Sequence, residues 1–264
     1  PFTLGGYLDM AMAGIAGCTV QITALNNSFL EGSMVDYQAY DALTFDCYGT
    51  LIDWESGILA GLRAALGSEV SEATDAELLG EFSTHEHDAE VPYKGYREVL
   101  GLTLRMLASA RGITTTPEQE AQFGGSVVDW PAFPDSHDAL VELQKHYKLV
   151  VITNCDDDLF AASAERLGIK FDEVITAQQV GSYKPNIDNF HFAHAKVERT
   201  LGITKDRILH VAQSLFHDHG PAKSIGMTTV HIKRRGNGAA PAASAAPDQV
   251  FPDMASFASA VIGS

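Results

Sequence analysis

Four short groups of polar residues could do chemistry, and each follows an apolar run of strand length. Asp46 ends the first run and is followed by the turn Gly49-Thr50. A carboxylate there can act as a nucleophile, forming an ester that water then cleaves, which divides one difficult displacement into two easier steps. An aspartate after a strand is also a common turn cap. The nucleophile interpretation is favoured by the other three groups, which are Thr153-Asn154, Lys184-Pro185 and Asp218.

A lysine beside the nucleophile would keep it ionised. An ammonium group within about 4–6 Å favours the charged form of a carboxylate and can lower its pKa by roughly 1–3 units. The ordinary alternative for Lys184 is a solvated surface lysine. Its position before Pro185, just after a strand and a turn, favours a place in the site.

Two histidine-rich segments raise the question of a metal site. His217 and His219 flank Asp218, but immediate neighbours rarely converge on one ion, so we expect structural histidines there. In the segment 85–88 (HEHD), residues one or two apart on a helix do not share a face, which favours a polar helix face. We therefore expect no metal ligands and no cofactor.

A parallel sheet is needed to bring these groups together. Apolar runs alternate with helix-patterned stretches, a pattern typical of a doubly wound α/β sheet whose ligands bind beyond the carboxyl ends of the strands. The predicted strands are Ala42–Phe45, Lys148–Thr153, Glu173–Thr176, Ile208–Ala212 and Thr229–Ile232. The predicted helices between them are Asp135–Tyr147, Asp157–Leu167 and Asn186–Leu201.

The interval 53–134 is helix-patterned without a convincing strand, which predicts an inserted helical cap domain. Its expected helices are Glu55–Leu66, Asp75–Asp88, Tyr96–Arg111 and Pro117–Phe123. The Rossmann-like core then comprises 34–52 and 135–264. Residues 1–33 contain no Lys or Arg, so this extension lacks the basic region of a secretory signal, and Met34 is a candidate original start.

Composition excludes several classes of partner. The 264 residues include 34 Asp+Glu against 18 Lys+Arg, for a net charge of −16, which argues against nucleic-acid binding because phosphate backbones need clustered cations. No segment is long and apolar enough to span a bilayer. The cysteines, Cys18, Cys47 and Cys155, are too few for a disulfide framework and favour a reducing cytoplasm.

In order and spacing, the four motifs resemble those of the haloacid dehalogenase superfamily of hydrolases, and 45–54 (FDCYGTLIDW) is similar to the type II 2-haloacid dehalogenases. The resemblance runs from about Tyr40 to the C-terminus, with the cap matched by position and helical character. It implies that Asp46 is the nucleophile, oriented by Thr50. It also implies that Lys184 keeps the carboxylate charged and that Asp218 positions water. Thr153 and Asn154 would bind the leaving group or substrate, and a homodimer is common among similar enzymes.

The residue two positions after the nucleophile is decisive. Phosphatases of the superfamily carry a second aspartate there as general acid, whereas this chain has Tyr48. Tyrosine, with an ordinary pKa of about 10, is a poor acid at neutral pH, but a departing halide needs no proton. It needs donors such as Asn154 and the first amides of the helix near Asp156. These features predict hydrolysis of short 2-haloalkanoic acids to 2-hydroxy acids and halide.

The chain departs from the type II pattern in the cap, in the fourth motif and at Phe190, which stands where those enzymes often have a tyrosine six positions beyond the lysine. Those enzymes hold the substrate carboxylate with a cap arginine, and the segment Glu81–Glu86 offers none, so Lys94 and Arg97 become the candidates. Arg97 is the better bidentate partner for a carboxylate. The fourth motif, Gln213–Asp218, has one extra residue and would present Ser214 and Phe216 to the substrate. Candidates for an apolar wall around the scissile carbon are Trp54, Trp130, Phe133 and Phe216.

Two rival functions remain open at this point. A phosphatase using Asp46 and Asp218 would require Mg²⁺ as cofactor, and Tyr48 counts against it. The altered fourth motif also permits a catalytically silent binding module on the same scaffold.

Overall fold

The computed structural model describes residues 35–234 and 243–263, so the predicted extension 1–33, Met34 and Cys18 lie outside the described residues. Six parallel strands form one sheet in the order β3-β2-β1-β4-β5-β6. Their bounds are β1 Ala42–Phe45, β2 Lys148–Thr153, β3 Glu173–Thr176, β4 Ile208–Ala212, β5 Thr228–Ile232 and β6 Gln249–Phe251. The predicted doubly wound α/β fold is confirmed, and β6 is an additional strand at the edge.

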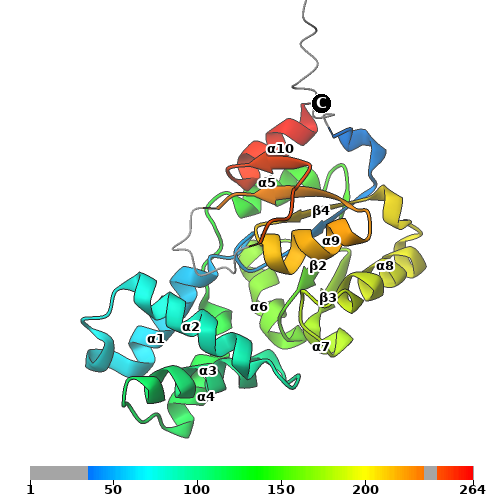
Figure 1. Ribbon diagram of the computed structural model, residues 1–264. Coiled ribbons are helices and arrows are strands. Elements are labelled where there is room, and N and C mark those ends of the chain that lie inside the picture. Colours follow the sequence, from blue (N-terminus) through cyan, green and yellow to red (C-terminus); the bar gives the residue numbers. More distant parts are fainter. Residues whose placement is uncertain (1–34, 235–242, 264) are drawn as a thin grey trace, which may run out of the picture. The chain divides into compact units, whose positions relative to one another are not determined.

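Helices cover both faces of this sheet (Figure 1). Alternation along β1 divides the core, because Leu43 and Phe45 pack on one face and Ala42 on the other. The first face is covered by α5 (Ser136–Leu143), α6 (Asp157–Leu167) and α10 (Met254–Ile262). The second is covered by α8 (Asp188–Leu201) and α9 (Gly220–Ser224). The remaining core elements are α7 (Ala177–Val180), the 3-10 turns Tyr37–Ala39 and Lys205–Arg207, and the π-helical turn Leu215–His219.

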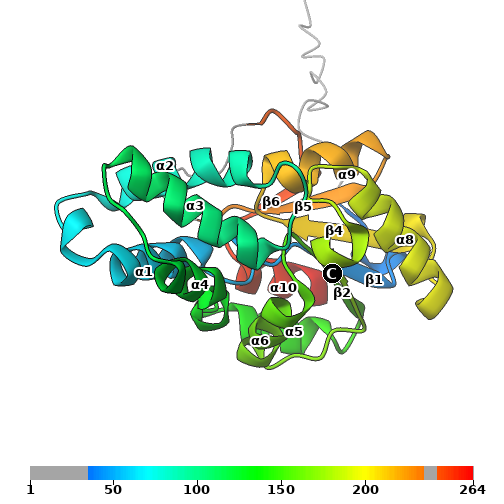
Figure 2. The same ribbon diagram turned by 90° about the horizontal axis from the view of Figure 1, so that it is seen from below.

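Four helices lie between β1 and α5 in sequence and group together beside the sheet (Figure 2). Thr74 and Thr116 form capping boxes that start the second and fourth of them. We call these four the cap helices; the division into a core and a cap domain stays our interpretation. They are α1 Trp54–Leu66, α2 Asp75–Ala89, α3 Tyr96–Ala110 and α4 Pro117–Gly125, with 3-10 turns at Gly67–Val70 and Ser126–Asp129.

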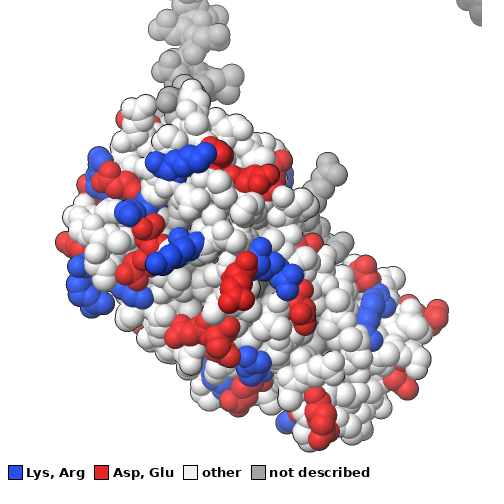
Figure 3. All heavy atoms as spheres, turned by 180° about the vertical axis from the view of Figure 1, so that it is seen from behind, with Lys and Arg blue, Asp and Glu red and all other residues white. Residues whose placement is uncertain are grey.

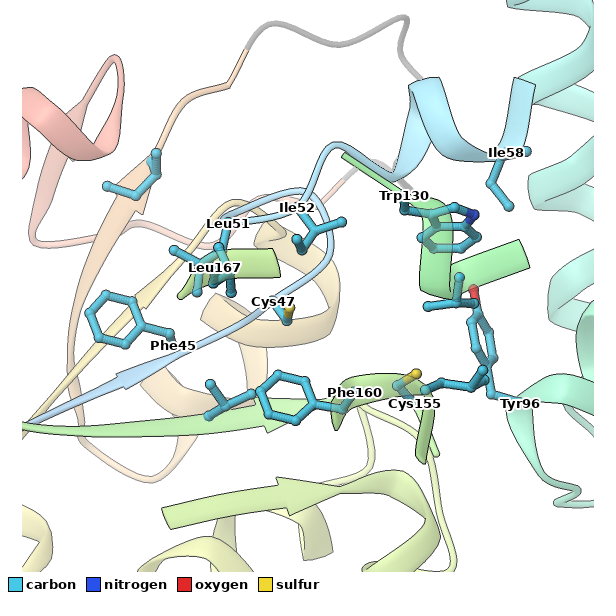
Figure 4. Close-up of a cluster of buried hydrophobic side chains, with 14 of the residues drawn as sticks. Phe45, Cys47, Leu51, Ile52, Ile58, Tyr96, Trp130, Cys155, Phe160 and Leu167 are labelled. Carbon is cyan, nitrogen blue, oxygen red and sulfur yellow. The ribbon is translucent and has the colours of Figure 1, made fainter. Parts of the chain in front are cut away.

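The chain passes between the sheet and the cap helices twice, and the two connecting segments are hydrogen-bonded to each other. The Asp53 amide donates to the Pro131 carbonyl at 2.8 Å, and the Phe133 amide donates to the Leu51 carbonyl at 3.0 Å. A Cβ on Gly57 would lie only 2.3 Å from the Trp130 ring, so this packing needs a glycine. Figure 4 shows the buried cluster that runs from β1 past this crossing to the cap helices.

Acidic and basic side chains are interspersed on the face drawn in Figure 3. Many of the exposed charges are paired across elements, as in Arg207–Asp41 at 2.6 Å and Lys148–Asp172 at 2.8 Å. Within the described ranges, none of the helices has the length and apolar character needed to cross a bilayer.

Candidate active site

A pocket of about 390 Å³ opens beyond the carboxyl ends of β1, β2 and β4. Parallel strands bring their carboxyl ends to one side of a sheet, so residues far apart in sequence meet there. The loop residues that line it are Asp46, Tyr48, Trp130, Asn154, Lys184, Gln213 and Ser214. Helix and π-turn residues complete the lining, namely Trp54, Ser83, Glu86, His87, Glu90, Tyr96, Phe216, His217 and Asp218.

Asp46 is held at the mouth of β1 by its backbone and by one hydroxyl. Its amide donates to the Val211 carbonyl, and its Oδ2 accepts from Thr50 Oγ1 at 2.7 Å. Thr50 Oγ1 in turn accepts from the Gln213 amide at 2.9 Å, which ties the turn to the end of β4. Gly49 has a φ of +95°, and a Cβ there would meet the Trp54 ring at 3.1 Å. Thr50 therefore lies where an orienting group is needed.

Lys184 is buried and has every N–H engaged. Its Nζ lies 2.8 Å from Asp46 Oδ1, 2.6 Å from Asp218 Oδ1 and 2.9 Å from the Ile152 carbonyl oxygen. Burial alone would lower the pKa of Lys184, but Asp218 and Asp46 outweigh it and hold that pKa above its usual range. One ammonium charge is therefore shared by two buried carboxylates.

Asp218 has a second partner, His210, which the sequence analysis did not single out. His210 is buried in β4, with its Nε2 3.2 Å from Asp218 Oδ1 and its Nδ1 2.9 Å from Thr44 Oγ1. Burial would raise the pKa of Asp218, yet Lys184 and His210 hold it below its usual range. Asp218 Oδ2 is buried and has no partner among the described residues. A histidine inside the apolar strand sequence ILHVA was the available signal.

Asn154 lines the pocket, whereas Thr153 does not. The Asn154 side chain clamps the backbone of Lys184, donating from Nδ2 to its carbonyl at 3.0 Å and accepting its amide at Oδ1 at 2.7 Å. One N–H of Asn154 is left over by this clamp. Thr153 is buried and its Oγ1 is unpartnered among the described residues, so its predicted contact with substrate is not supported by its placement.

The hydroxyl of Tyr48 is directed to other groups. It donates to Cys155 Sγ at 3.3 Å and pairs with Ser163 Oγ at 3.0 Å, while its ring meets Trp130 edge-on at a centroid distance of 5.4 Å. Burial, with Cys155 and Cys47 nearby, raises the pKa of Tyr48 well above its ordinary value. Tyr48 is therefore a weaker acid in the fold than in water.

The altered fourth motif is accommodated by the π-helical turn. The His219 amide donates to the Ser214 carbonyl at 3.2 Å. This hydrogen bond spans five residues, one more than the hydrogen bond of an α-helix, so the turn accommodates one extra residue. Ser214 and Phe216 both line the pocket, and their contact with substrate stays a prediction. Trp54 and Trp130 also line it, but Phe133 does not and instead packs under Arg234 at 4.2 Å.

The two predicted carboxylate holders are placed elsewhere. Lys94 Nζ donates to the Ala89 and Pro92 carbonyls at 3.0 and 2.8 Å. The Arg97 guanidinium pairs with Asp158 at 2.6 Å on the surface. Neither side chain lines the pocket, so the expectation that one of them binds the substrate is not supported by their placement. The cause is local pairing, which spacing along the chain does not reveal.

The acidic run at the start of α6 has partners outside its own helix. Asp156 does not simply face the dipole of its own helix, because Oδ1 and Oδ2 accept the Tyr96 and Arg97 amides at 3.0 and 3.1 Å and thus cap α3. Asp157 accepts from Thr176 Oγ1 at 2.6 Å. Asp156, which lies in the loop after β2, therefore caps α3, one of the cap helices.

The last turn of α2 and the residue that follows it contribute carboxyl groups to the pocket, although the segment 85–88 was predicted to form a polar helix face. Glu86, His87 and Glu90 line the pocket. Burial raises the pKa of Glu86 to about 7. A hydrogen bond from the Tyr96 hydroxyl at 2.7 Å acts in the opposite direction and lowers it by less. Burial and the neighbouring Glu86 raise the pKa of Glu90 to about 8. Their four-residue spacing on one helix face was the available signal.

No cluster of three or more His, Cys, Asp or Glu suited to a metal ion occurs in the described part of the chain. Asp46 and Asp218, the two carboxylates nearest the strand ends, each give one oxygen to Lys184.

Comparisons with known proteins find related sequences and a related fold. A family model described as haloacid dehalogenase-like hydrolase matches residues 40–216. The chain is 28% identical over 206 residues to the (S)-2-haloacid dehalogenase of Xanthobacter autotrophicus, covering 73% of this chain and 75% of the relative. It is 25% identical over 205 residues to (S)-2-haloacid dehalogenase 4A of Burkholderia cepacia, covering 74% of this chain and 84% of the relative.

A solved structure shares the fold. It is the L-2-haloacid dehalogenase of Xanthobacter autotrophicus with chloropropionic acid covalently bound, which superposes with a TM-score of 0.70 at 23% identity. The match covers 85% of this chain and 99% of that structure.

Proposed function

Because the chain belongs to the haloacid dehalogenase-like hydrolases, we propose that it hydrolyses the carbon–halogen bond of short 2-haloalkanoic acids and their close derivatives. The names of its relatives support this substrate class. The observation that carries the proposal is twofold. Asp46 is ion-paired with Lys184, and Tyr48 occupies the position where a phosphatase has its proton donor. Cytoplasmic location and a homodimer stay predictions.

The first step is displacement of the halide by Asp46. One carboxylate oxygen attacks carbon 2 of the substrate, a C–O bond forms, and the halide leaves with the electron pair of the carbon–halogen bond. Lys184 and Thr50 hold the carboxylate in one orientation through Oδ1 and Oδ2. The free N–H of Asn154 is available to the departing anion. The covalent adduct in the Xanthobacter structure supports this kind of intermediate.

The second step is hydrolysis of the ester at Cγ of Asp46. Water attacks Cγ, the bond from Cγ to the ester oxygen breaks, and one water proton goes to the departing alcohol. Asp218 takes the other proton through its unpartnered Oδ2 and passes it to solvent. The balance is one haloacid and one water giving one 2-hydroxy acid, one halide and one proton. Asp46 is regenerated with an oxygen atom from water.

Tyr48 restricts the reaction to leaving groups that depart without a proton. An alkoxide needs a proton, and Tyr48 has a raised pKa and a hydroxyl already bonded to Cys155 and Ser163. A halide departs without one. Phosphate monoesters are therefore expected to be poor substrates.

The test is halide release from chloro-, bromo- and fluoroacetate and from both 2-chloropropionate enantiomers, with and without a chelator. A single turnover in ¹⁸O-labelled water should place the label in the peptide containing Asp46 and leave the product unlabelled. Asp46→Asn should lower the rate by about 10³-fold or more. Asp218→Asn should release one equivalent of halide and then accumulate the ester, detectable by mass.

Phosphate release from sugar or nucleotide monoesters that is abolished by the chelator, with no halide from any haloacid, would contradict the proposal in favour of the Mg²⁺-dependent phosphatase. No turnover and no adduct on Asp46 would instead favour the silent binding module.

A further inference from the structure

The part of the pocket lined by α2 is rich in acceptors. Glu86 in the last turn of α2 and Glu90, the C-cap residue that follows this helix, lie four residues apart and both line the cavity. Tyr96 donates its hydroxyl to Glu86 Oε1 at 2.7 Å, so this residue already behaves as an acceptor. The carboxyl of Glu90 has no hydrogen-bond partner among the residues the structure describes. At a pH high enough to ionise these carboxyls, whose pKa values are raised to about 7 for Glu86 and about 8 for Glu90, this end of the pocket repels a carboxylate.

Among the described residues, the pocket lining offers no free Lys or Arg to these groups. Lys184 is the one Lys or Arg among the described lining residues, and its three N–H groups are taken by Asp46, Asp218 and a carbonyl oxygen. Burial lowers the pKa of His217 to about 4, so His217 is neutral at pH 7. Lys94 and Arg97, the cations nearest in sequence, are engaged outside the cavity.

The cavity is a ligand site on independent grounds. Asp218 lines it, is fully buried, and keeps Oδ2 without a partner in the described structure. A buried carboxylate oxygen without a donor is costly, which points to a bound group or water at this place. The acceptors of α2 thus lie on a cavity that already contains the reacting residues.

We propose that the α2 end of this pocket binds an uncharged N–H donor, so that the preferred substrate is a 2-haloamide rather than the free 2-haloacid. The inference rests on the proposed dehalogenation at Asp46. A carboxamide has the shape of a carboxylate, but it offers two N–H donors to Glu86 and Glu90 and brings no further negative charge. The reaction is otherwise unchanged, and 2-chloropropionamide with water gives 2-hydroxypropionamide, chloride and a proton.

A matched substrate pair tests the proposal. 2-Chloropropionamide and 2-chloropropionate share the carbon skeleton and leaving group, and differ in the group that would face α2. At pH 8 we expect kcat/KM for chloride release to favour the amide by on the order of tenfold or more. Equal rates, or a preference for the acid, would overturn the inference while leaving the dehalogenase proposal intact.

Variants assign the preference to α2. Glu90→Gln keeps an acceptor but removes the charge, so the amide preference should fall several-fold, chiefly through a lower KM for the acid. Glu90→Arg should reverse the preference. Asp88→Asn is the control, because Asp88 lies on the same helix outside the pocket lining and should leave the ratio unchanged. An unchanged ratio in both Glu90 variants would contradict the assignment.

Binding can be read without turnover. Trp54 and Trp130 are the two tryptophans of the chain and both line the pocket, so their fluorescence should report occupancy. Propionamide should bind more tightly than propionate to the wild-type chain, and Glu90→Gln should reduce the difference. Preference for propionamide without halide release from any probe would overturn the dehalogenation but support the acceptor subsite. Tighter binding of propionate would overturn the subsite itself.

Discussion

Asp46 and Asp218 share the single ammonium group of Lys184, and this makes the lysine the critical residue of the site. Without it, two buried carboxylates would face each other with no cation, which disfavours ionisation of Asp46, the proposed nucleophile. The same group also stabilises the fold, because removing one partner of a buried ion pair costs about 3–5 kcal/mol.

Lys184→Met is therefore expected to lower the rate of halide release by about 10²-fold or more, and to lower the free energy of unfolding. Halide assays and urea unfolding measure the two effects. Lys145→Met, which removes an exposed lysine paired with Glu142, is the control and should leave both nearly unchanged. A wild-type rate in Lys184→Met would contradict the role of the ammonium group.

The acid limb of the pH–rate profile should belong to Asp46. Burial raises the pKa of Asp46 above its ordinary value of 3.8, with Lys184 opposing the shift, whereas the pKa of Asp218 is held low. Attack requires the deprotonated form, so activity should fall as pH decreases, with a midpoint above 3.8. Initial rates between pH 3.5 and 8, on protein shown to stay folded, measure this. A midpoint at or below 3.8 would contradict it.

At the scale of elements, the start of α3 depends on a residue from the core. Gly95 at its N-cap has no side chain, and the two carboxylate oxygens of Asp156 accept the first amides instead. Tyr96, one of the capped residues, lines the pocket and bonds to Glu86. This contact therefore couples a cap helix to the strand end after β2.

Asp156→Ala should lower the free energy of unfolding by about 0.5–2 kcal/mol, the usual cost of losing a helix cap. KM should rise more than kcat falls, because Tyr96 and α2 shape the pocket without holding Asp46. Asp158→Ala is the matched control, since this neighbouring aspartate makes an exposed pair with Arg97. Its effect should stay below about 1 kcal/mol. Equal effects of the two variants would argue against the capping role.

At the scale of the whole molecule, the half-buried carboxyl of Glu90 predicts a pH-dependent stability. The pKa of Glu90 rises from an ordinary 4.5 to about 8 in the fold, so the folded state holds a proton that the unfolded state has lost. That contribution is fully present below pH 4.5 and is lost as pH rises towards 8. Glu90 therefore lowers the free energy of unfolding at neutral and alkaline pH.

Wild-type protein should therefore lose stability relative to Glu90→Gln as pH increases from 5 to 8, by at most about 1.4 kcal/mol per pH unit. Urea unfolding at several pH values measures the difference between the two proteins. A constant difference across this range would show that Glu90 titrates as it does in water.

Local pattern was sufficient for most elements, and the reacting residues stay a prediction. β1 to β4 and α6 have the predicted bounds, because apolar runs closed by polar or small residues are local signals. Helix α8 begins at Asp188 rather than Asn186, since the Asn186 side chain accepts the Asp188 amide and forms a turn. The short edge strand β6 and α10 were not predicted.

The order of residues along the chain determined that Asp46, Lys184 and Asp218 follow apolar segments, and parallel strands leave such residues on one side of a sheet. Only the tertiary structure decided which side chains reach the pocket. Arg97 pairs with Asp158 and Lys94 donates to backbone carbonyls, so neither lines the pocket. Asp156 caps a helix whose first residue is sixty positions away. Glu86 and Glu90 line the pocket. The physical reason is that a charged side chain goes to the partner it meets in space, and that partner is set by packing between segments distant in sequence.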